Sequence, residues 1–138
     1  MIKILLISIL VQLMLLSNSF SNESIYNTNF YNVNIDGNYI QEAKENEISR
    51  IKKLSFDNIT KRILNKDEII KLKKYNINLN SIIKNILIED EFISENKYKA
   101  KIKINFDNTE LVNLFRKYKI NYTDYQSPAH LLIVAEKK

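Results

Sequence analysis

The densest group of side chains that could do chemistry in this sequence is the run of three carboxylates Glu89, Asp90 and Glu91. Neighbouring carboxylates can hold Ca²⁺ or act as a general acid and base pair. Consecutive residues of a strand point to opposite faces, so we expect only Glu89 and Glu91 to share a side, and no glycine turn shapes a calcium loop here. We therefore predict no metal site and no acid/base pair at this run.

The single histidine, His130, is the other candidate catalytic group, as a general base. The chain has no cysteine and no second histidine to complete a metal site, and no spacing relates His130 to a serine or an aspartate. We predict no catalytic, cofactor-binding or metal-binding residues, and we expect a protein that is not an enzyme. A small hydrolase that uses carboxylates or a Ser/Lys pair stays open as the enzyme alternative.

The scarcity of glycine and cysteine excludes most other kinds of site. The 138 residues include one glycine, Gly37, one proline, Pro128, no cysteine and no tryptophan. Glycine-rich phosphate loops need several glycines, whereas zinc sites of cysteine and histidine, cysteine nucleophiles and disulfides need cysteine. Those classes are excluded, and we expect no cofactor.

A row of lysines could form a surface for an anionic ligand. Lys97, Lys99, Lys101 and Lys103 alternate with Tyr98, Ala100, Ile102, Ile104 and Phe106. RNA-recognition modules stack bases on exposed aromatic side chains, whereas Tyr98 and Phe106 share the apolar face and are expected in the core. The net charge of +5 rests on 18 lysines and three arginines, although arginine is favoured for phosphate and base contacts. We predict no nucleic-acid partner; a weak binder of nucleic acid or an anionic surface is the alternative.

The first 21 residues have the three parts of a secretory signal peptide. Lys3 supplies a positive charge, residues 4–16 are almost wholly apolar, and Ser19 and Ser21 occupy the small-residue positions before a cut at Asn22. The apolar run is shorter than the ~20 residues that span a bilayer. We predict a signal peptide at 1–21, a flexible lead-in at 22–29 and a single α+β domain at 30–138. In the alternative, the signal is not cleaved, and the chain contacts the membrane through this segment only.

The mature chain is expected to begin with a strand and a long helix. Phe30–Ile35 alternates apolar and polar residues, as a half-buried strand does. Asn38 with Gln41 three residues later indicates a helix cap. Apolar residues at helical spacing then predict one helix from about Tyr39 to Leu64.

Shorter helices are predicted where the same capping pattern recurs. Asn65 with Glu68 starts one helix to about Lys74, and Asp107 with Glu110 starts another to about Lys119. Apolar spacing predicts a further helix over Leu79–Ile86. The loop that follows the helix ending at about Lys119 could line a binding surface through Tyr122, Tyr125 and Gln126. A loop packed over the sheet edge is the commoner outcome.

A hairpin is predicted between a strand at Ile86–Ile93 and the strand that carries the row of lysines. Its loop has three residues, Ser94–Asn96, and Asn96 is expected to take a left-handed backbone conformation. This loop sets apolar residues opposite one another inside and opposite charges outside: Phe92 with Tyr98, Ile88 with Ile102, Ile86 with Ile104, Glu91 with Lys99, and Glu89 with Lys101. Asp90 then points inward opposite Ala100. That flaw indicates a bulge or a frayed site.

A last strand is expected over Leu131–Ala135, entered through Pro128. The order strand, helices, strand, strand, helix, strand predicts an α+β two-layer sandwich, with helices on one face of a mainly antiparallel four-stranded sheet. Because the last strand is apolar on both faces, its second face needs a cover. The predicted partner is an envelope protein or a second copy of the chain, which contacts Leu131, Leu132, Ile133 and Val134.

The chain resembles an exported proteobacterial family, domain of unknown function 2066. The resemblance rests on a Tyr-x-Ala strand that runs from Tyr98 to Phe106-Asp107, a helix with Leu111 and Leu114, and an apolar strand entered through Pro128. It implies export to a Gram-negative envelope and supplies no catalytic residues. We therefore expect an exported periplasmic protein with a non-enzymatic protein-interaction domain.

Overall fold

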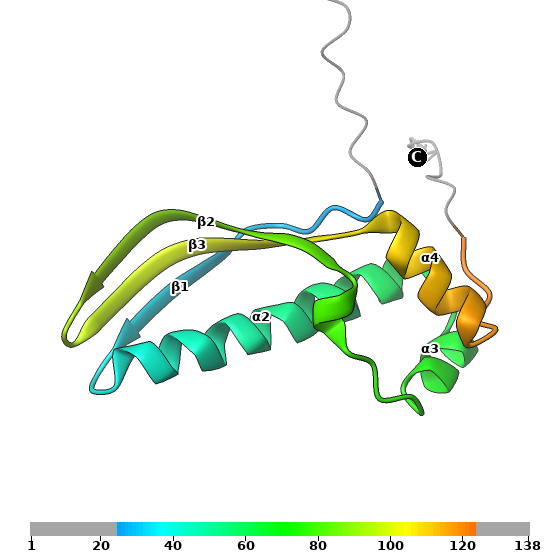
Figure 1. Ribbon diagram of the computed structural model, residues 1–138, viewed down its shortest axis with the longest axis horizontal. Helices are drawn as coiled ribbons and strands as arrows, with labels where there is room; N and C mark the ends of the chain where they lie inside the picture. Colours follow the sequence, from blue (N-terminus) through cyan, green and yellow to red (C-terminus); the bar gives the residue numbers. More distant parts are fainter. Residues whose placement is uncertain (1–24, 124–138) are drawn as a thin grey trace, which may run out of the picture.

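The computed structural model describes residues 25–123, which form a sheet and a long helix packed face to face, with two short helices at one end (Figure 1). The elements follow the order β1 (Tyr31–Asp36), α2 (Ile40–Ile63), α3 (Lys66–Leu72), the 3₁₀ turn η1 (Leu79–Ser81), β2 (Ile83–Ser94), β3 (Lys97–Phe106) and α4 (Asn108–Lys117). The expected α+β class is confirmed. Within these residues, none of the helices combines the length and apolar character that a membrane crossing requires.

The sheet is antiparallel, and β3 is its central strand in the order β1-β3-β2. Strand β1 lies along one side of β3, with Val33 opposite Ala100 and Ile35 opposite Tyr98. The described residues thus contain three strands where four were predicted. The fourth, expected at Leu131–Ala135, lies outside the described residues.

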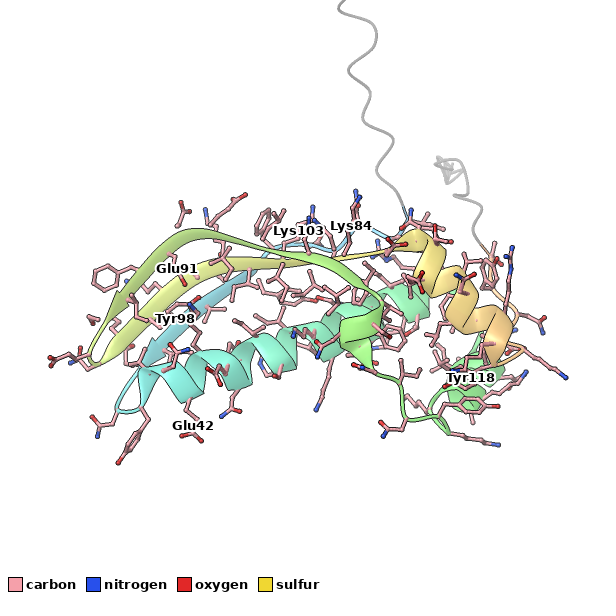
Figure 2. All side chains as sticks on the ribbon, in the orientation of Figure 1. Glu42, Lys84, Glu91, Tyr98, Lys103 and Tyr118 are labelled. Carbon is pink, nitrogen blue, oxygen red and sulfur yellow. The ribbon has the colours of Figure 1, made fainter. Side chains whose placement is uncertain are left out.

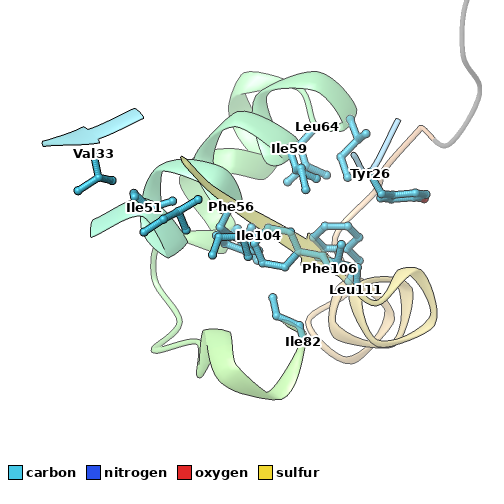
Figure 3. Close-up of a cluster of buried hydrophobic side chains, with 14 of the residues drawn as sticks. Tyr26, Val33, Ile51, Phe56, Ile59, Leu64, Ile82, Ile104, Phe106 and Leu111 are labelled. Atoms are coloured by element: carbon cyan, nitrogen blue, oxygen red, sulfur yellow. The ribbon is translucent and has the colours of Figure 1, made fainter. Parts of the chain in front are cut away.

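The core lies between α2 and the inner face of β3. Ile51 and Ile59 of the helix and Tyr98, Ile102 and Ile104 of the strand are fully buried, which confirms the predicted alternation along β3. Figure 3 shows how the strand and the helices meet in this cluster, to which Phe56, Phe106 and Leu111 contribute. The predicted long helix is confirmed almost to the residue.

The turn between β1 and α2 is not capped in the predicted way. Tyr39, rather than Asn38, occupies the N-cap position, with φ 60° and no side-chain hydrogen bond to the helix. Gly37 has φ 143° and donates its backbone N–H to the carbonyl oxygen of Asn96 at 2.9 Å. This bond ties the turn to the tip of the β2–β3 hairpin. The chain therefore reverses within three residues, through two positive-φ positions, instead of entering the helix through an asparagine cap.

Two of the three predicted caps are confirmed. The side chain of Asn65 accepts a hydrogen bond from the backbone N–H of Glu68, and that of Asp107 accepts from Thr109 and Glu110. The prediction of a helix over Leu79–Ile86 is wrong. A single 3₁₀ turn stands there, and β2 already begins at Ile83, because Ile83 pairs with Phe106 at the far end of β3.

The packed core extends to both ends of the described residues. Tyr26 and Thr28, inside the expected lead-in at 22–29, are buried, and the hydroxyl of Thr28 donates to the carbonyl of Ile104 at 2.6 Å. At the other end, the N–H of Thr123 donates to the carbonyl of Ile63 at 2.9 Å. The chain thus leaves the described part beside the C-terminal end of α2.

Candidate functional site

The outer edge of strand β2 is the main unpaired surface of this sheet. In residues 25–123, β2 pairs with β3 alone, so one side of its twelve-residue backbone has no strand beside it. Unpaired strand edges present rows of N–H and C=O groups that can accept another strand. Edge strands in soluble proteins are commonly short or otherwise protected, and twelve residues is long by that standard.

The predicted register of β2 holds from Ile86 to Glu89 and then shifts by one residue. Ile86 lies opposite Ile104, Ile88 opposite Ile102, and Glu89 opposite Lys101, all as predicted. A bulge interrupts the ladder between Glu89 and Phe92, and Asp90 takes φ 51° there. The expected bulge or frayed site at Asp90 is thus a bulge. A residue with positive φ is a known way to accommodate the extra residue of a bulge.

Beyond the bulge the predictions for the hairpin are wrong. Phe92 lies opposite Lys99 and Ile93 opposite Tyr98, and Ser94 pairs with Lys97, so the loop has two residues rather than three. Asn96 is not among the positive-φ residues, and Asp90 takes the left-handed conformation instead. Because side chains alternate between faces, the one-residue shift moves Phe92 from the predicted buried face to the outer face.

Four large apolar side chains are exposed along this edge. The exposed fractions are 39% for Leu87, 37% for Ile88, and 53% for both Phe92 and Ile93. Leu87 and Phe92 lie opposite lysines on the outer face, whereas Ile88 and Ile93 lie opposite Ile102 and Tyr98 on the inner face. Helix α2 packs against β3 and β1. It leaves the inner face of β2 partly uncovered, so both faces of the edge carry exposed apolar side chains.

The bulge also turns Glu91 toward the helix. Its carboxylate accepts hydrogen bonds from the Lys44 ammonium at 2.6 Å and from the Tyr98 hydroxyl at 3.0 Å. Lys44 also lies 4.9 Å from the centre of the Tyr98 ring. Figure 2 shows Glu91 and Tyr98 near the hairpin end of the sheet. This network fastens the tip of β2 to the first turns of α2.

The ionisable groups of this network shift one another's pKa values. The hydrogen bond from Lys44 lowers the pKa of Glu91, and the bond from Tyr98 adds to it. The same bond to Glu91 raises the pKa of Lys44, although burial opposes it. Burial, followed by the bond to Glu91, raises the pKa of the Tyr98 hydroxyl. The ionised carboxylate and ammonium are therefore both stabilised in the folded chain.

The three neighbouring carboxylates have different surroundings, which argues against a shared site. Asp90 forms an ion pair with Lys101 at 2.8 Å, Glu91 binds Lys44 and Tyr98, and Glu89 lies opposite Lys101 in the ladder. The expectation that Glu89 and Glu91 share a side is wrong, because the bulge separates them. No group of three potential ligands among His, Cys, Asp and Glu occurs in the described part of the chain.

The lysine row is mostly engaged with neighbouring side chains. Lys97 pairs with Asp36 at 2.8 Å, Lys101 pairs with Asp90, and the Lys103 ammonium lies 5.6 Å from the centre of the Phe30 ring. Tyr98 and Phe106 are buried, so their predicted role in core packing is confirmed. Strand β3 itself therefore contributes no exposed aromatic ring for base stacking, although Phe92 of β2, opposite Lys99, and Phe30, beside Lys103, are exposed.

The remaining sequence candidates fall at the end of the chain. Tyr122 is packed, but its partner is Phe115 of α4, with 5.4 Å between ring centres, rather than the expected sheet edge. Tyr125, Gln126 and His130 lie outside the described residues. Sequence reasoning missed Phe92 and Ile93 as exposed groups. The one signal for them was the inward-pointing Asp90.

Comparisons with known proteins add no assignment. No family model matches the chain, and neither the curated proteins nor the solved structures searched contain a match.

Proposed function

We propose that the protein is a non-enzymatic interaction domain of the periplasm that binds an extended segment of another envelope protein along the free edge of β2. The observation that carries the proposal is the twelve-residue unpaired edge with four exposed apolar side chains. In strand addition, main-chain hydrogen bonds supply affinity, and alternate side chains supply specificity. A short edge covered with charge would not favour such binding.

The side chains of the edge define the partner. Apolar pairs stand on either side of the bulge, Leu87 with Ile88 and Phe92 with Ile93. Between them lies Glu89, an exposed carboxylate without an ion pair among the described residues. The matching segment has apolar residues at both ends and a lysine or arginine in the middle. A second copy of β2 fits this edge poorly, because its middle carries the carboxylates of residues 89–91 where the matching segment carries a lysine or arginine.

A crosslinking experiment tests this proposal. We expect a photoreactive residue at Ile93, which is 53% exposed, to crosslink an envelope protein in living cells, and one at Ile70 of α3, which is 59% exposed, not to do so. Phe92→Lys and Glu89→Lys should each abolish the crosslink. Addition of the captured segment should slow hydrogen exchange of β2 amides and leave those of β1 unchanged. Equal crosslinking from Ile70, or unchanged β2 exchange, would refute strand addition.

We propose that Leu131–Ala135 forms the fourth strand, beside β1. The observed order β1-β3-β2 leaves that position free in the predicted β-α-β-β-α-β arrangement. The chain leaves the described part at Thr123, bonded to Ile63, and the neighbouring Arg62 donates to the Asn27 carbonyl at 2.5 Å, close to the start of β1. Seven residues separate Thr123 from Leu131, which reach roughly 25 Å when extended.

The second face of that strand supplies the other proposed contact. Leu131, Leu132, Ile133 and Val134 would offer an apolar surface to an envelope protein or to a second copy. Native mass spectrometry should show whether Leu132→Lys with Val134→Lys removes a complex. If the strand lies beside β1, hydrogen exchange of the β1 amides should be slower in the parent protein than in this double variant. Equal exchange in the two proteins would count against that position.

Export rests on the N-terminal pattern of charge, apolar run and small residues. Fractionation should recover the protein in the periplasm, with Asn22 as its first residue. Recovery in the membrane fraction with Met1 retained would support the uncleaved anchor instead. Recovery in the cytoplasm would overturn the proposed location.

A further inference from the structure

A groove beneath the sheet, lined in part by the segment that leads into β2, has no role in the proposed function. It lies between the middle of α2, helix α3 and the segment that leads to η1, and has a volume of about 420 Å³. That volume is in the range of small-molecule sites in proteins. The two helices and the segment at 75–80 each contribute wall residues, so the groove is formed by the fold rather than by one loop.

The floor of the groove is apolar and held in place. Phe56 and Leu72 belong to the core, and Ile77 and Leu79 pack against it. Tyr75 is partly exposed, and its ring stacks on Tyr118 of α4 with 4.1 Å between ring centres. The walls are therefore largely preformed, which lowers the entropy cost of binding.

The charged groups that line the groove are mainly positive. They are the ammonium groups of Lys52, Lys53 and Lys73 and one carboxylate, Asp57. Lys52 donates to the side-chain oxygen of Asn80 at 2.9 Å, across the groove from α2 to the segment before β2. Within the described residues, the ammonium groups of Lys53 and Lys73 form no ion pair or hydrogen bond. Two lysines are thus available to a ligand.

We propose that this groove binds an amphiphilic anion, with an apolar body on the Phe56 and Leu79 floor and one carboxylate or phosphate head at Lys53 and Lys73. The excess of ammonium groups over carboxylates selects against a cationic head, because like charges in a partly desolvated groove repel. The apolar floor selects against a wholly polar anion such as inorganic phosphate, which gains nothing from burial. Free fatty acids and lipid headgroup esters share the required chemistry.

Binding of decanoate to the full exported protein, in the form recovered from the cell and without detergent, tests the proposal. Titration followed by NMR should show saturable binding at one site, with shifts at Phe56, Tyr75 and Leu79. Decyltrimethylammonium, with the same chain and a positive head, should bind at least about tenfold more weakly, a difference of about 1.4 kcal/mol. Decyl phosphate should bind as decanoate does if the head is recognised by charge alone. Weaker binding of decyl phosphate than of decanoate would assign the site to fatty acids.

Charge variants separate this groove from general surface attraction. Lys53→Glu with Lys73→Glu should weaken decanoate binding by about tenfold or more, whereas Lys61→Glu with Lys99→Glu, the same charge change at exposed lysines outside the groove, should not. Leu79→Asp removes part of the apolar floor and should weaken the binding of decanoate and of decyl phosphate. Equal binding of the cation, equal loss in both lysine variants, or the absence of saturation would overturn the proposal.

Discussion

The turn between β1 and α2 predicts opposite effects of two substitutions that lie two residues apart. Tyr39 has a left-handed backbone, which costs a non-glycine residue about 1–2 kcal/mol. Its side chain is 82% exposed, so little burial is lost on removing it. Glycine avoids the backbone cost but gives up about 0.5–1 kcal/mol through its freer unfolded chain. Tyr39→Gly should therefore stabilise the protein by about 0.5–1 kcal/mol.

Gly37→Ala should have the reverse effect. A φ of 143° is reached almost only by glycine, and holding another residue there costs about 1–3 kcal/mol. No atom lies within 4 Å of the position that a Cβ would take, so the cost comes from the backbone and not from a steric clash. The bond from the Gly37 N–H to Asn96 prevents the turn from relaxing without detaching the hairpin tip.

Urea unfolding measures both effects. The unfolding midpoint should rise for Tyr39→Gly and fall for Gly37→Ala, with the same dependence on urea concentration. Tyr39→Ala is the matched control, because it removes the ring but keeps the strained backbone, and its stability should stay within about 0.5 kcal/mol of the parent. A destabilised Tyr39→Gly, or a Gly37→Ala with unchanged stability, would refute the assignment of strain to this turn.

Three further predictions concern the hairpin and the core. Ile102→Ala should lower the free energy of unfolding by about 2–5 kcal/mol in urea, because Ile102 is fully buried at the centre of the sheet. Asp90→Gly should retain stability, whereas Asp90→Val should lose it by circular dichroism melting, since valine resists the positive φ of the bulge. The depressed pKa of Glu91 implies a contribution to stability that is present above its unfolded pKa of about 4.5. This contribution is lost as pH falls through the lower folded pKa. Glu91→Gln should therefore flatten the acid side of a plot of urea midpoint against pH. The raised pKa of Lys44 gives the opposite sign, with stability present below about 10.5 and lost as pH rises above it.

The hairpin shows how far sequence reasoning reaches in this protein. Alternation along β3 was enough to predict its buried face and the pairs from Ile86 to Glu89, because those depend on period and charge within two adjacent strands. The one-residue shift depends on Glu91 reaching Lys44, a residue of α2 that is 47 positions away in sequence. A contact of that kind is tertiary, and local patterns do not contain it.

The candidate site was harder to predict for the same reason. Ile88 and Ile93 have the composition of core residues, and only the position of α2 under β3 and β1 leaves them exposed. The failed helix at Leu79–Ile86 has a related cause, since apolar spacing over eight residues fits a helix and a strand about equally well. The pairing of Ile83 with Phe106 decided in favour of the strand.

The central place of β3 also sets the order in which the sheet can assemble. Strands β2 and β3 are joined by a two-residue turn and can meet as soon as both exist, whereas β1 must wait for a partner that comes after α2, α3 and β2 in the chain. Pairings between distant segments carry a loop-closure cost that slows folding. During synthesis, β1 emerges first and completes its hydrogen bonds last. We expect it to be the strand most exposed to chaperones and to misfolding before β3 is made.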